Sequence, residues 1–493
     1  MKLEDLAERI PGARLLGAGD ADVSRAVHDS RQVRAGDLFV ALPGTQTDGH
    51  RFVQPALEAG AAAAVVEHEV DLPGQPPLLV VRSAREALGL AAHALAGDPT
   101  RRMTVCGVTG TTGKTTTTYL VRSIFGQADR PAGVIGTIGT VIGRREVPNR
   151  LTTPDADVLA RFFAEMVEAG LDAAVMEVSS HALHQRRTAG IAFDVGAFTN
   201  LSPEHMDYHQ DMTSYREAKG MLFAGLPADA TAVLNADEEA SASFAEATPA
   251  GLLWYGLAHP ADVTAENLRS DTQGSRFTLV LPRGRAEVRT RLLGTHNVYN
   301  CLTAAAIAAA VDLPTDAIVA GIEGLQTVRG RLEPVPTDLG FSVLVDYAHK
   351  TDALEHALNT VRDLVDDQGR VILVFGCGGD RDRQKRPAMA AVAEERADRI
   401  IVTNDNPRSE KPQAIADEIL AGFTSREAVT VDLDRRQAIA DALAEARPGD
   451  VVIIAGKGHE TYQIEGDVTR PFDDREVAAE ILGSLESRGA EGG

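Results

Sequence analysis

The feature that most constrains the fold is a β-branched, apolar run that leads through a Gly- and Thr-rich loop into a helix-forming segment. The run covers residues 103–109, and Lys114 with Thr115 opens the helical segment. Glycines let backbone N–H groups approach phosphate oxygens, and the helix N-terminus favours negative charge. Lys114 can reach the β- and γ-phosphates, while the Thr115 hydroxyl suits Mg²⁺. The segment therefore predicts a strand, a phosphate loop for ATP or GTP, and a helix.

The loop departs from the commoner phosphate-loop spacing by one residue. Val108 stands where that spacing requires glycine, with Gly107 and Gly110 on either side. A simple Gly/Thr turn with an exposed lysine is the alternative interpretation. The strand before the loop and the helix after it favour the phosphate loop.

A chain of 493 residues is too long for one hydrophobic core and suggests about three domains. Short apolar strand candidates alternate with helical segments, which is typical of parallel α/β sheets. A stop signal precedes residue 100, and a second change in pattern lies near residues 324–336. We predict an α/β protein with a smaller α/β N-terminal domain (1–99), a central P-loop-type domain with a mostly parallel sheet (100–330), a Rossmann-like C-terminal domain (331–485) and a disordered tail (486–493).

Composition narrows the partners. With 49 Lys and Arg against 71 Asp and Glu, the net charge is −22, which disfavours nucleic acid and anionic membrane surfaces. Three cysteines without a CxxC pair indicate a reducing compartment. The N-terminus lacks a signal-peptide h-region, and the longest apolar candidate, residues 304–311, reads as a buried helix. We predict a cytoplasmic, monomeric protein that acts on small molecules.

Further motifs follow the loop in a fixed order. They are Glu-Val-Ser-Ser-His at 177–181, Thr-Asn-Leu-Ser-Pro-Glu-His-Met-Asp-Tyr-His at 199–209, Gly-Thr-His-Asn-Val-Tyr-Asn at 294–300, Gly-Arg at 330–331 and Asp-Tyr-Ala-His at 346–349. Together with the Thr-Gly-Thr-x-Gly-Lys-Thr loop, this series resembles the Mur ligase family, the ATP-dependent amide-bond ligases of peptidoglycan and hence cell-wall synthesis. The resemblance covers nearly the whole chain.

The resemblance implies a reaction in which ATP activates a carboxylate as an acyl phosphate that an amine then attacks. Cations must neutralise the charge that develops in both steps. By resemblance, the catalytic residues are Lys114, Glu177, His205 and a carbamylated Lys219, and the Mg²⁺ ligands are Thr115, Glu177, His205 and Lys219. Taken alone, Glu177 could be a solvated strand-end carboxylate, His205 a structural histidine and Lys219 a surface lysine.

The same resemblance implies the binding residues for the two larger substrates. Asn300, like Asn297, can offer a side-chain amide to a base edge, and Tyr347 resembles a contact to the ribose and base. Leu151 and Thr112 stand where relatives commonly have asparagine. The family's contact at position 151 therefore does not carry over, whereas little changes at position 112, where the backbone binds. The residues implied for ATP are Gly110, Thr111, Thr112, Gly113, Lys114, Thr115, Thr116, Asn297, Arg331 and Asp346. Those implied for a UDP-sugar peptide are Ser30, Thr45, Gln46, Thr47, Thr152, Thr153, Ser179, Gln185 and Arg187.

Within the family, the Asp-Ser-Arg at 29–31, the Gly-Asp-Leu-Phe-Val at 36–40 and the Asp-Asn-Pro-Arg at 405–408 resemble the members that add diaminopimelate. An arginine suits a second carboxylate, which lysine and ornithine lack at the far end. The residues implied for this acceptor are Arg381, Asp405, Asn406, Pro407, Arg408, Gly456 and Glu460. Alternatives are L-lysine or L-ornithine as acceptor, another Mur ligase, a folylpolyglutamate synthase, a non-catalytic P-loop binding protein, or a capped turn with a surface arginine at 405–408.

Overall fold

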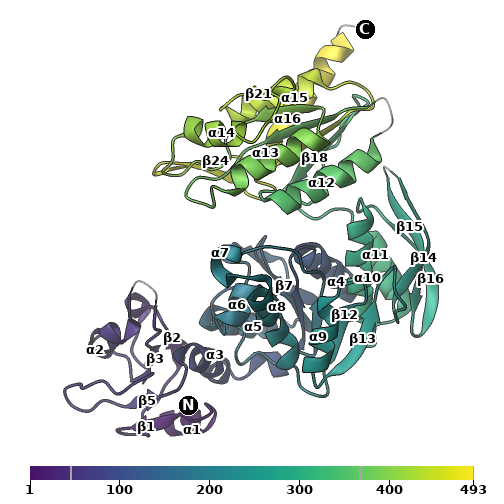
Figure 1. Cartoon of the computed structure of the whole chain (residues 1–493). Helices are drawn as coiled ribbons and strands as arrows, with labels where there is room; N and C mark the ends of the chain where they lie inside the picture. Colours follow the sequence, from purple (N-terminus) through teal and green to yellow (C-terminus); the bar gives the residue numbers. More distant parts are fainter. Residues whose placement is uncertain (45–46, 272, 366–368, 492–493) are drawn as a thin grey trace. The chain divides into compact units, whose positions relative to one another are not determined.

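The structure is a computed structural model that describes residues 1–44, 47–271, 273–365 and 369–491 (Figure 1). The chain divides into two compact units. The first contains residues 1–267, 277–288 and 299–324, and the second contains 268–276, 289–298 and 325–493. The change near residue 324 falls inside the region where the sequence pattern shifts, whereas the domain limits at 99/100 and 330/331 stay predictions.

The first unit begins with a five-stranded sheet of order β1-β5-β4-β3-β2, parallel except for β1. Side chains along β3 alternate between two apolar clusters, with Leu38 and Val40 on one face and Phe39 and Ala41 on the other. Both faces are therefore covered. The elements are α1 (Leu3–Glu8), β1 (Arg14–Leu16), β2 (Arg25–Val27), η1 (Ser30–Gln32), β3 (Asp37–Val40), η2 (Gly49–Phe52), α2 (Val53–Glu58), β4 (Ala63–Val66), β5 (Leu78–Val80), α3 (Ala84–Leu95) and η3 (Pro99–Arg101).

The same unit contains an eight-stranded sheet of order β13-β12-β11-β6-β10-β7-β8-β9. Six neighbouring strands are parallel, and β8 and β9 continue the sheet antiparallel. The strands are β6 (Thr104–Thr109), β7 (Ala132–Ile135), β8 (Thr140–Ile142), β9 (Arg145–Val147), β10 (Ala173–Glu177), β11 (Val195–Phe198), β12 (Thr231–Asn235) and β13 (Gly251–Tyr255). Because β7 and β10 lie on one side of β6 and β11 to β13 on the other, the strand order reverses at β6, the kind of position where open α/β sheets bind ligands.

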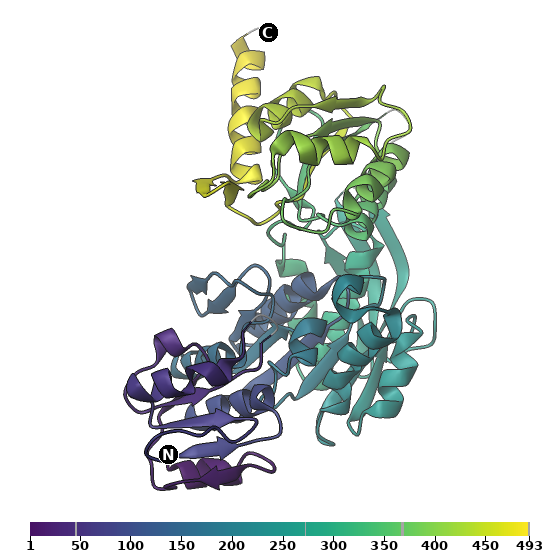
Figure 2. The same ribbon diagram turned by 60° about the vertical axis from the view of Figure 1, so that its left-hand side comes forward.

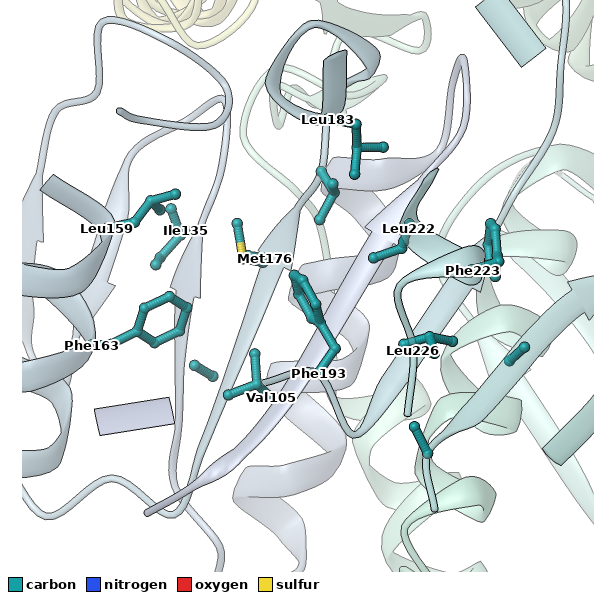
Figure 3. Close-up of a cluster of buried hydrophobic side chains, with 14 of the residues drawn as sticks. Val105, Ile135, Leu159, Phe163, Met176, Leu183, Phe193, Leu222, Phe223 and Leu226 are labelled. Atoms are coloured by element: carbon teal, nitrogen blue, oxygen red, sulfur yellow. The ribbon is translucent and has the colours of Figure 1, made fainter. Parts of the chain in front are cut away.

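Helices α5 and α8 pack on one face of this sheet. Phe163 and Leu222 from these helices join Val105, Met176 and Phe193 in one buried cluster (Figure 3). The helices of this region are α4 (Lys114–Gln127), α5 (Ala156–Glu168), α6 (Ser180–His184), α7 (Met206–His209), α8 (Met212–Ala224), α9 (Ala240–Ala247), α10 (Thr295–Ala310) and α11 (Thr315–Gly324). The predicted buried helix at 304–311 is confirmed by α10. A three-stranded sheet follows, made of β14 (Thr264–Asp271), β15 (Gly274–Leu281) and β16 (Gly284–Thr290).

The second unit holds a six-stranded sheet of order β17-β18-β22-β19-β20-β21 and the hairpin β23-β24. All its neighbouring strand pairs except β17-β18 are parallel. The elements are β17 (Glu333–Pro334), β18 (Ser342–Asp346), α12 (Thr351–Leu364), β19 (Val371–Phe375), α13 (Lys385–Arg396), β20 (Arg399–Val402), α14 (Pro412–Leu420), β21 (Val429–Val431), α15 (Arg435–Glu445), β22 (Val451–Ala455), β23 (Tyr462–Glu465), β24 (Val468–Pro471) and α16 (Asp474–Glu491). This arrangement confirms the predicted α/β class.

Alternation along β19 shows that the sheet is covered on both faces. Leu373 and Phe375 pack with α12, α13 and α14, whereas Ile372 and Val374 pack with α15 and α16. The yellow helix in Figure 2 is α16. Residues 486–491, which the sequence predicts to be disordered, lie within this helix. None of the helices in the described part of the chain combines the length and hydropathy of a bilayer span.

A buried ion pair joins α15 to α16. Arg435 and Asp474 have no exposed side-chain surface and form two contacts of 2.7 Å.

Asp474→Ala would leave the guanidinium buried without its counter-ion, so we expect it to reduce the stability of the second unit by about 3–5 kcal/mol. Urea unfolding followed by circular dichroism measures this. Trp254, the only tryptophan, lies in the first unit and should report an unchanged environment. A loss no larger than that of Glu480→Ala, which breaks an exposed ion pair, would contradict the expectation.

Candidate active site

The loop between β6 and α4 has the geometry that the sequence predicts. Gly110 and Gly113 have φ angles of +149° and +82°, which side-chain-bearing residues rarely adopt. A Cβ atom on Gly110 would lie 1.8 Å from the Thr199 hydroxyl, and one on Gly113 would lie 2.4 Å from Asn300 Oδ1. The loop therefore requires glycine at both positions, and its amides precede the N-terminus of α4.

Residues directly after β11 hold this loop in place. The Thr112 N–H donates to Asn200 Oδ1 at 2.9 Å, and the Thr111 N–H donates to the Asn200 carbonyl at 2.9 Å. The Thr199 hydroxyl donates to the Thr112 carbonyl at 2.7 Å. Asn200 and Thr199 are loop-supporting residues that sequence reasoning left without a role, although they open the motif at 199–209.

Two lysines converge on one carbonyl of the loop. Lys114 Nζ and Lys219 Nζ each donate to Gly110 O at 2.7 Å, and Lys114 also donates to Thr111 O at 2.7 Å. Lys219 is buried, with its ammonium 4.3 Å from the centre of the Tyr215 ring. In a chain of net charge −22, the loop thus has a concentrated positive field aimed at an anion. The surface position that the spacing of Lys219 suggested is wrong.

The neighbouring strand β10 ends in a buried carboxylate. Glu177 Oε1 accepts from the Thr137 N–H at 2.8 Å, and Oε2 accepts from the Thr137 hydroxyl at 3.0 Å. Its place beside Val108 of β6 puts it at the same edge of the sheet as the loop. The alternative of a solvated strand-end carboxylate is therefore wrong, because only 1% of the residue is exposed.

His205 lies in a cluster of aromatic rings and histidines. It caps α7 at a φ of +58°, its ring centre is 4.5 Å from that of His181, and Nε2 lies 3.6 Å from Glu204 Oε1. His209 in the same cluster contacts the Ser180 hydroxyl at 2.9 Å, and burial lowers its pKa to about 4. Across the described residues, no group of three or more His, Cys, Asp or Glu side chains is placed to hold a metal ion.

Most residues predicted for the UDP-sugar peptide form one network at this edge. The Thr153 hydroxyl donates to Glu177 O at 2.8 Å and accepts from the Ser179 N–H at 3.0 Å. Arg187 donates to Thr153 O at 2.9 Å and to Gln185 Oε1 at 2.6 Å. The Thr152 hydroxyl contacts that of Thr137 at 3.1 Å, which extends the network to Glu177.

The predicted residues of the N-terminal region are placed separately. Ser30 begins the short helix η1, which the Asp29 carboxylate caps by accepting from the Arg31 N–H at 3.0 Å. Thr47 lies just before η2. Thr45 and Gln46 are outside the described residues.

Three predicted nucleotide residues, Asn297, Arg331 and Asp346, belong to the second unit. Asp346 accepts from the backbone N–H groups of Leu332 at 2.7 Å and Ala348 at 2.8 Å, and burial raises the pKa of its carboxyl. The Arg331 guanidinium lies 5.1 Å from the centre of the Tyr347 ring. Asp346 thus fixes the backbone beside Arg331, and the nucleotide contacts of these residues stay predictions.

The second unit also gathers the residues predicted for the acceptor. Asn406 Nδ2 donates to Glu460 Oε2 at 2.7 Å, and the buried Lys457 donates to Asn406 Oδ1 at 3.2 Å. Arg408 has a φ of +52° and donates to Gly379 O at 2.8 Å. A Cβ on Gly456 would lie 2.9 Å from Asp405 Oδ2. Burial raises the pKa of Glu460 and lowers that of Lys457. Lys457 is not among the acceptor residues predicted from the sequence.

Known proteins match the chain along most of its length. Family models match at residues 23–94 (Mur ligase family, catalytic domain), 108–308 (Mur ligase middle domain) and 330–458 (Mur ligase, glutamate ligase domain). Two relatives are both named UDP-N-acetylmuramoyl-L-alanyl-D-glutamate–2,6-diaminopimelate ligase. That of Bacillus licheniformis is 47% identical over 95% of this chain and 96% of its own. That of Geobacter metallireducens is 45% identical over 99% and 100%.

Solved structures agree. A structure of a UDP-N-acetylmuramoyl-L-alanyl-D-glutamate–2,6-diaminopimelate ligase matches with a TM-score of 0.72 and 31% identity over 99% of both chains. The MurF ligase of Thermotoga maritima in complex with ADP matches in fold, with a TM-score of 0.61 and 19% identity over 94% of this chain and 99% of that one. Family models, relatives and structures thus confirm the resemblance that the ordered motifs predict, and the chain belongs to the Mur ligase family.

Proposed function

We propose that this chain is an ATP-dependent ligase that joins meso-2,6-diaminopimelate to the D-glutamate of UDP-N-acetylmuramoyl-L-alanyl-D-glutamate. The observation that carries the proposal is the convergence of Lys114 and Lys219 on Gly110 O at the edge where the buried Glu177 ends β10. A protein that only binds nucleotide has no need for a second buried lysine and a buried carboxylate there. The relatives at 45–47% identity have the name of this reaction.

In the first half of the proposed reaction, a carboxylate oxygen of the substrate attacks the γ-phosphorus of ATP. The bond to the bridging oxygen breaks, ADP leaves, and an acyl phosphate forms. The loop amides and Lys114 would bind the β- and γ-phosphates and offset the charge that spreads over the transferring group. The related MurF structure that contains ADP supports nucleotide binding by this fold.

Mg²⁺ would further neutralise the phosphate oxygens. Magnesium is commonly held by one or two carboxylates together with substrate phosphates and water, so the absence of a full protein cage among the described residues fits this metal. Glu177 and the Thr115 hydroxyl would hold a first ion. His205 and a carbamate on Lys219 would hold a second, because a carbamate replaces an ammonium with anionic oxygens.

In the second half, the amine of the acceptor attacks the acyl carbon, phosphate leaves and the nitrogen loses a proton. The network of Thr153, Ser179, Gln185 and Arg187 would orient the muramoyl dipeptide beside Glu177. Ser30, with Thr45, Gln46 and Thr47, would bind the uridine diphosphate. Asn297, Arg331 and Asp346 are proposed as nucleotide contacts from the second unit.

The acceptor would occupy the site formed by Asp405–Arg408, Arg381, Gly456 and Glu460. Arg408 would present a planar cation to the distal carboxylate, and the Glu460 carboxylate would receive the distal ammonium. L-Lysine or L-ornithine is the alternative acceptor, since either has the ammonium without the carboxylate.

We place the enzyme in the cytoplasm as a monomer of cell-wall synthesis, which fits the buried thiols of Cys106 and Cys377.

Replacing Glu177 tests the metal assignment. Glu177→Gln keeps an acceptor for the Thr137 N–H but removes the charge, so we expect kcat to fall about 10²-fold and the Mg²⁺ concentration for half-maximal activity to rise about tenfold. Steady-state assays over a Mg²⁺ titration measure both quantities. Glu168→Gln, at an exposed helix end, is the control. Unchanged Mg²⁺ dependence in Glu177→Gln would exclude Glu177 as a ligand.

Phosphate release tests the proposed function directly. We expect release only when ATP, Mg²⁺, UDP-N-acetylmuramoyl-L-alanyl-D-glutamate and an amino-acid acceptor are all present, and none after addition of EDTA until Mg²⁺ is restored. Equal release without the acceptor or without the UDP-dipeptide would favour a simple ATPase. No release with any acceptor would overturn the ligase assignment.

A further inference from the structure

The fully buried Arg386 and the partly buried Glu410 join the two loops that contain Arg381 and Arg408. Arg386, near the start of α13, has no exposed surface and donates twice to Glu410, from Nη1 to Oε2 at 2.9 Å and from Nη2 to Oε1 at 2.8 Å. It also donates to Glu418 Oε2 at 2.7 Å and to Gly378 O at 3.2 Å. In the described part of the chain, the hydrogen bonds of this guanidinium go to Gly378, Glu410 and Glu418, none of which belongs to the predicted acceptor set.

Glu410 passes the constraint from Arg386 to both loops. Its Oε1 accepts from the Asp380 N–H at 2.7 Å, and its own N–H donates to Pro407 O at 3.0 Å. Asp380 in turn accepts from Ser409, from the hydroxyl at 2.6 Å and from the N–H at 3.2 Å. The loop at 378–381 and the turn at 405–410 are therefore tied together by side-chain bonds on both sides.

The tie holds two residues in a backbone conformation that they adopt rarely. Asp380 and Arg408 have φ angles of +53° and +52°, a left-handed state that is strained for residues with a Cβ. Such a state persists where the surroundings over-determine it. The two loops also pack closely here, since a Cβ on Gly379 would lie 1.8 Å from Pro407 O. This packing and the side-chain bonds together constrain both residues.

From these contacts we infer that Glu410, held by Arg386, is a positioning residue that aims Arg408 at the acceptor amino acid. The inference rests on the proposed acceptor site. Arg408 donates to Gly379 O at 2.8 Å, and the Gly379 N–H donates to Asn406 O at 2.9 Å, so a shift of one loop moves the guanidinium. The Arg386–Glu410 bond keeps the pKa of Glu410 at about 2, and the pair stays charged at neutral pH.

Glu410→Gln in the full-length chain tests the inference. The amide keeps an oxygen for the Asp380 N–H but loses the charge that binds Arg386. We expect the KM for meso-diaminopimelate to rise about tenfold, with kcat and the KM values for ATP and the UDP-dipeptide within twofold of wild type. Asp450→Asn is the control, because it weakens another ion pair of the same unit, in which the Arg370 guanidinium donates twice to Asp450 Oδ2 just before β19 and β22.

A double variant separates positioning from general destabilisation. If Glu410 acts through Arg408, Glu410→Gln combined with Arg408→Ala should be no worse than Arg408→Ala alone. Ser409→Ala, at an exposed position, removes the hydroxyl bond to Asp380 but neither partner of the Arg386–Glu410 pair, and should raise the same KM about threefold. Three results would each overturn the inference. They are an acceptor KM that is unchanged in both Glu410→Gln and Ser409→Ala, KM values that rise equally for all three substrates, and a double variant whose loss is the product of the two single losses. An inactive wild-type chain would instead overturn the proposed function.

Discussion

Lys219→Ala is expected to lower kcat about 10²- to 10³-fold while the protein remains folded and still binds ATP. The loss is that of one preorganised charge-stabilising group at the transferring phosphoryl. Lys219 is buried with its ammonium on Gly110 O and over the Tyr215 ring, so the alanine variant leaves a cavity beside the loop. Steady-state phosphate release measures kcat, and nucleotide binding by fluorescence tests the fold of the loop.

The same position distinguishes a carbamate from an ammonium. Lys219→Arg keeps a cation but cannot form a carbamate, so we expect it to be as inactive as the alanine variant. Formate or acetate should partly restore Lys219→Ala, because a small carboxylate can take the place of the carbamate oxygens. Wild-type activity in Lys219→Arg, with no rescue of Lys219→Ala, would show that the ammonium itself is the working group.

Arg408→Ala is expected to lower kcat/KM for diaminopimelate about 10²- to 10³-fold, with little change in the KM for ATP. Truncating Arg408 would leave the distal carboxylate of diaminopimelate without its counter-charge, and the loss of one partner of such a pair costs about 2–5 kcal/mol. Arg408→Lys keeps the charge without the planar fork and should lie between alanine and wild type. Full kinetic constants for each substrate measure the effect.

Arg426→Ala, an exposed arginine of the same unit, is the control for surface charge. If Arg408→Ala used diaminopimelate as well as this control does, Arg408 would not bind the distal carboxylate. If it lost ATP binding to the same extent, the defect would be in the unit as a whole.

Strands buried on both faces could be predicted from sequence. Residues 371–375 and 451–455 are continuous apolar runs, and the structure places β19 and β22 there. Polar or exposed strands could not be predicted in this way. The segment of β14 is exposed and mostly polar, and the strands of the hairpin β23-β24 have four residues each, which is too short for the Tyr-Gln-Ile-Glu alternation of β23 to distinguish a strand from a loop.

The motifs placed the loop and the carboxylate, but not the residues that support them. Asn200 binds Thr112 across 88 residues, and Arg386 binds Glu410 across 24, and such tertiary pairs leave no local pattern. Lys219 did leave a signal. It lies on α8 beside Ala218 and at helical spacing from Tyr215 and Leu222, all buried, and this apolar stripe is the signal that the interpretation as a surface lysine overlooked.

The most direct test of the account is a competition for acceptor. ATP, Mg²⁺ and UDP-N-acetylmuramoyl-L-alanyl-D-glutamate are mixed with equal concentrations of meso-diaminopimelate, L-lysine and L-ornithine, and the UDP-tripeptides are resolved by mass. The account predicts the diaminopimelate product in at least about 10²-fold excess, since the other acceptors leave Arg408 unpaired. A predominant lysine or ornithine product, or ADP without any tripeptide, would contradict it.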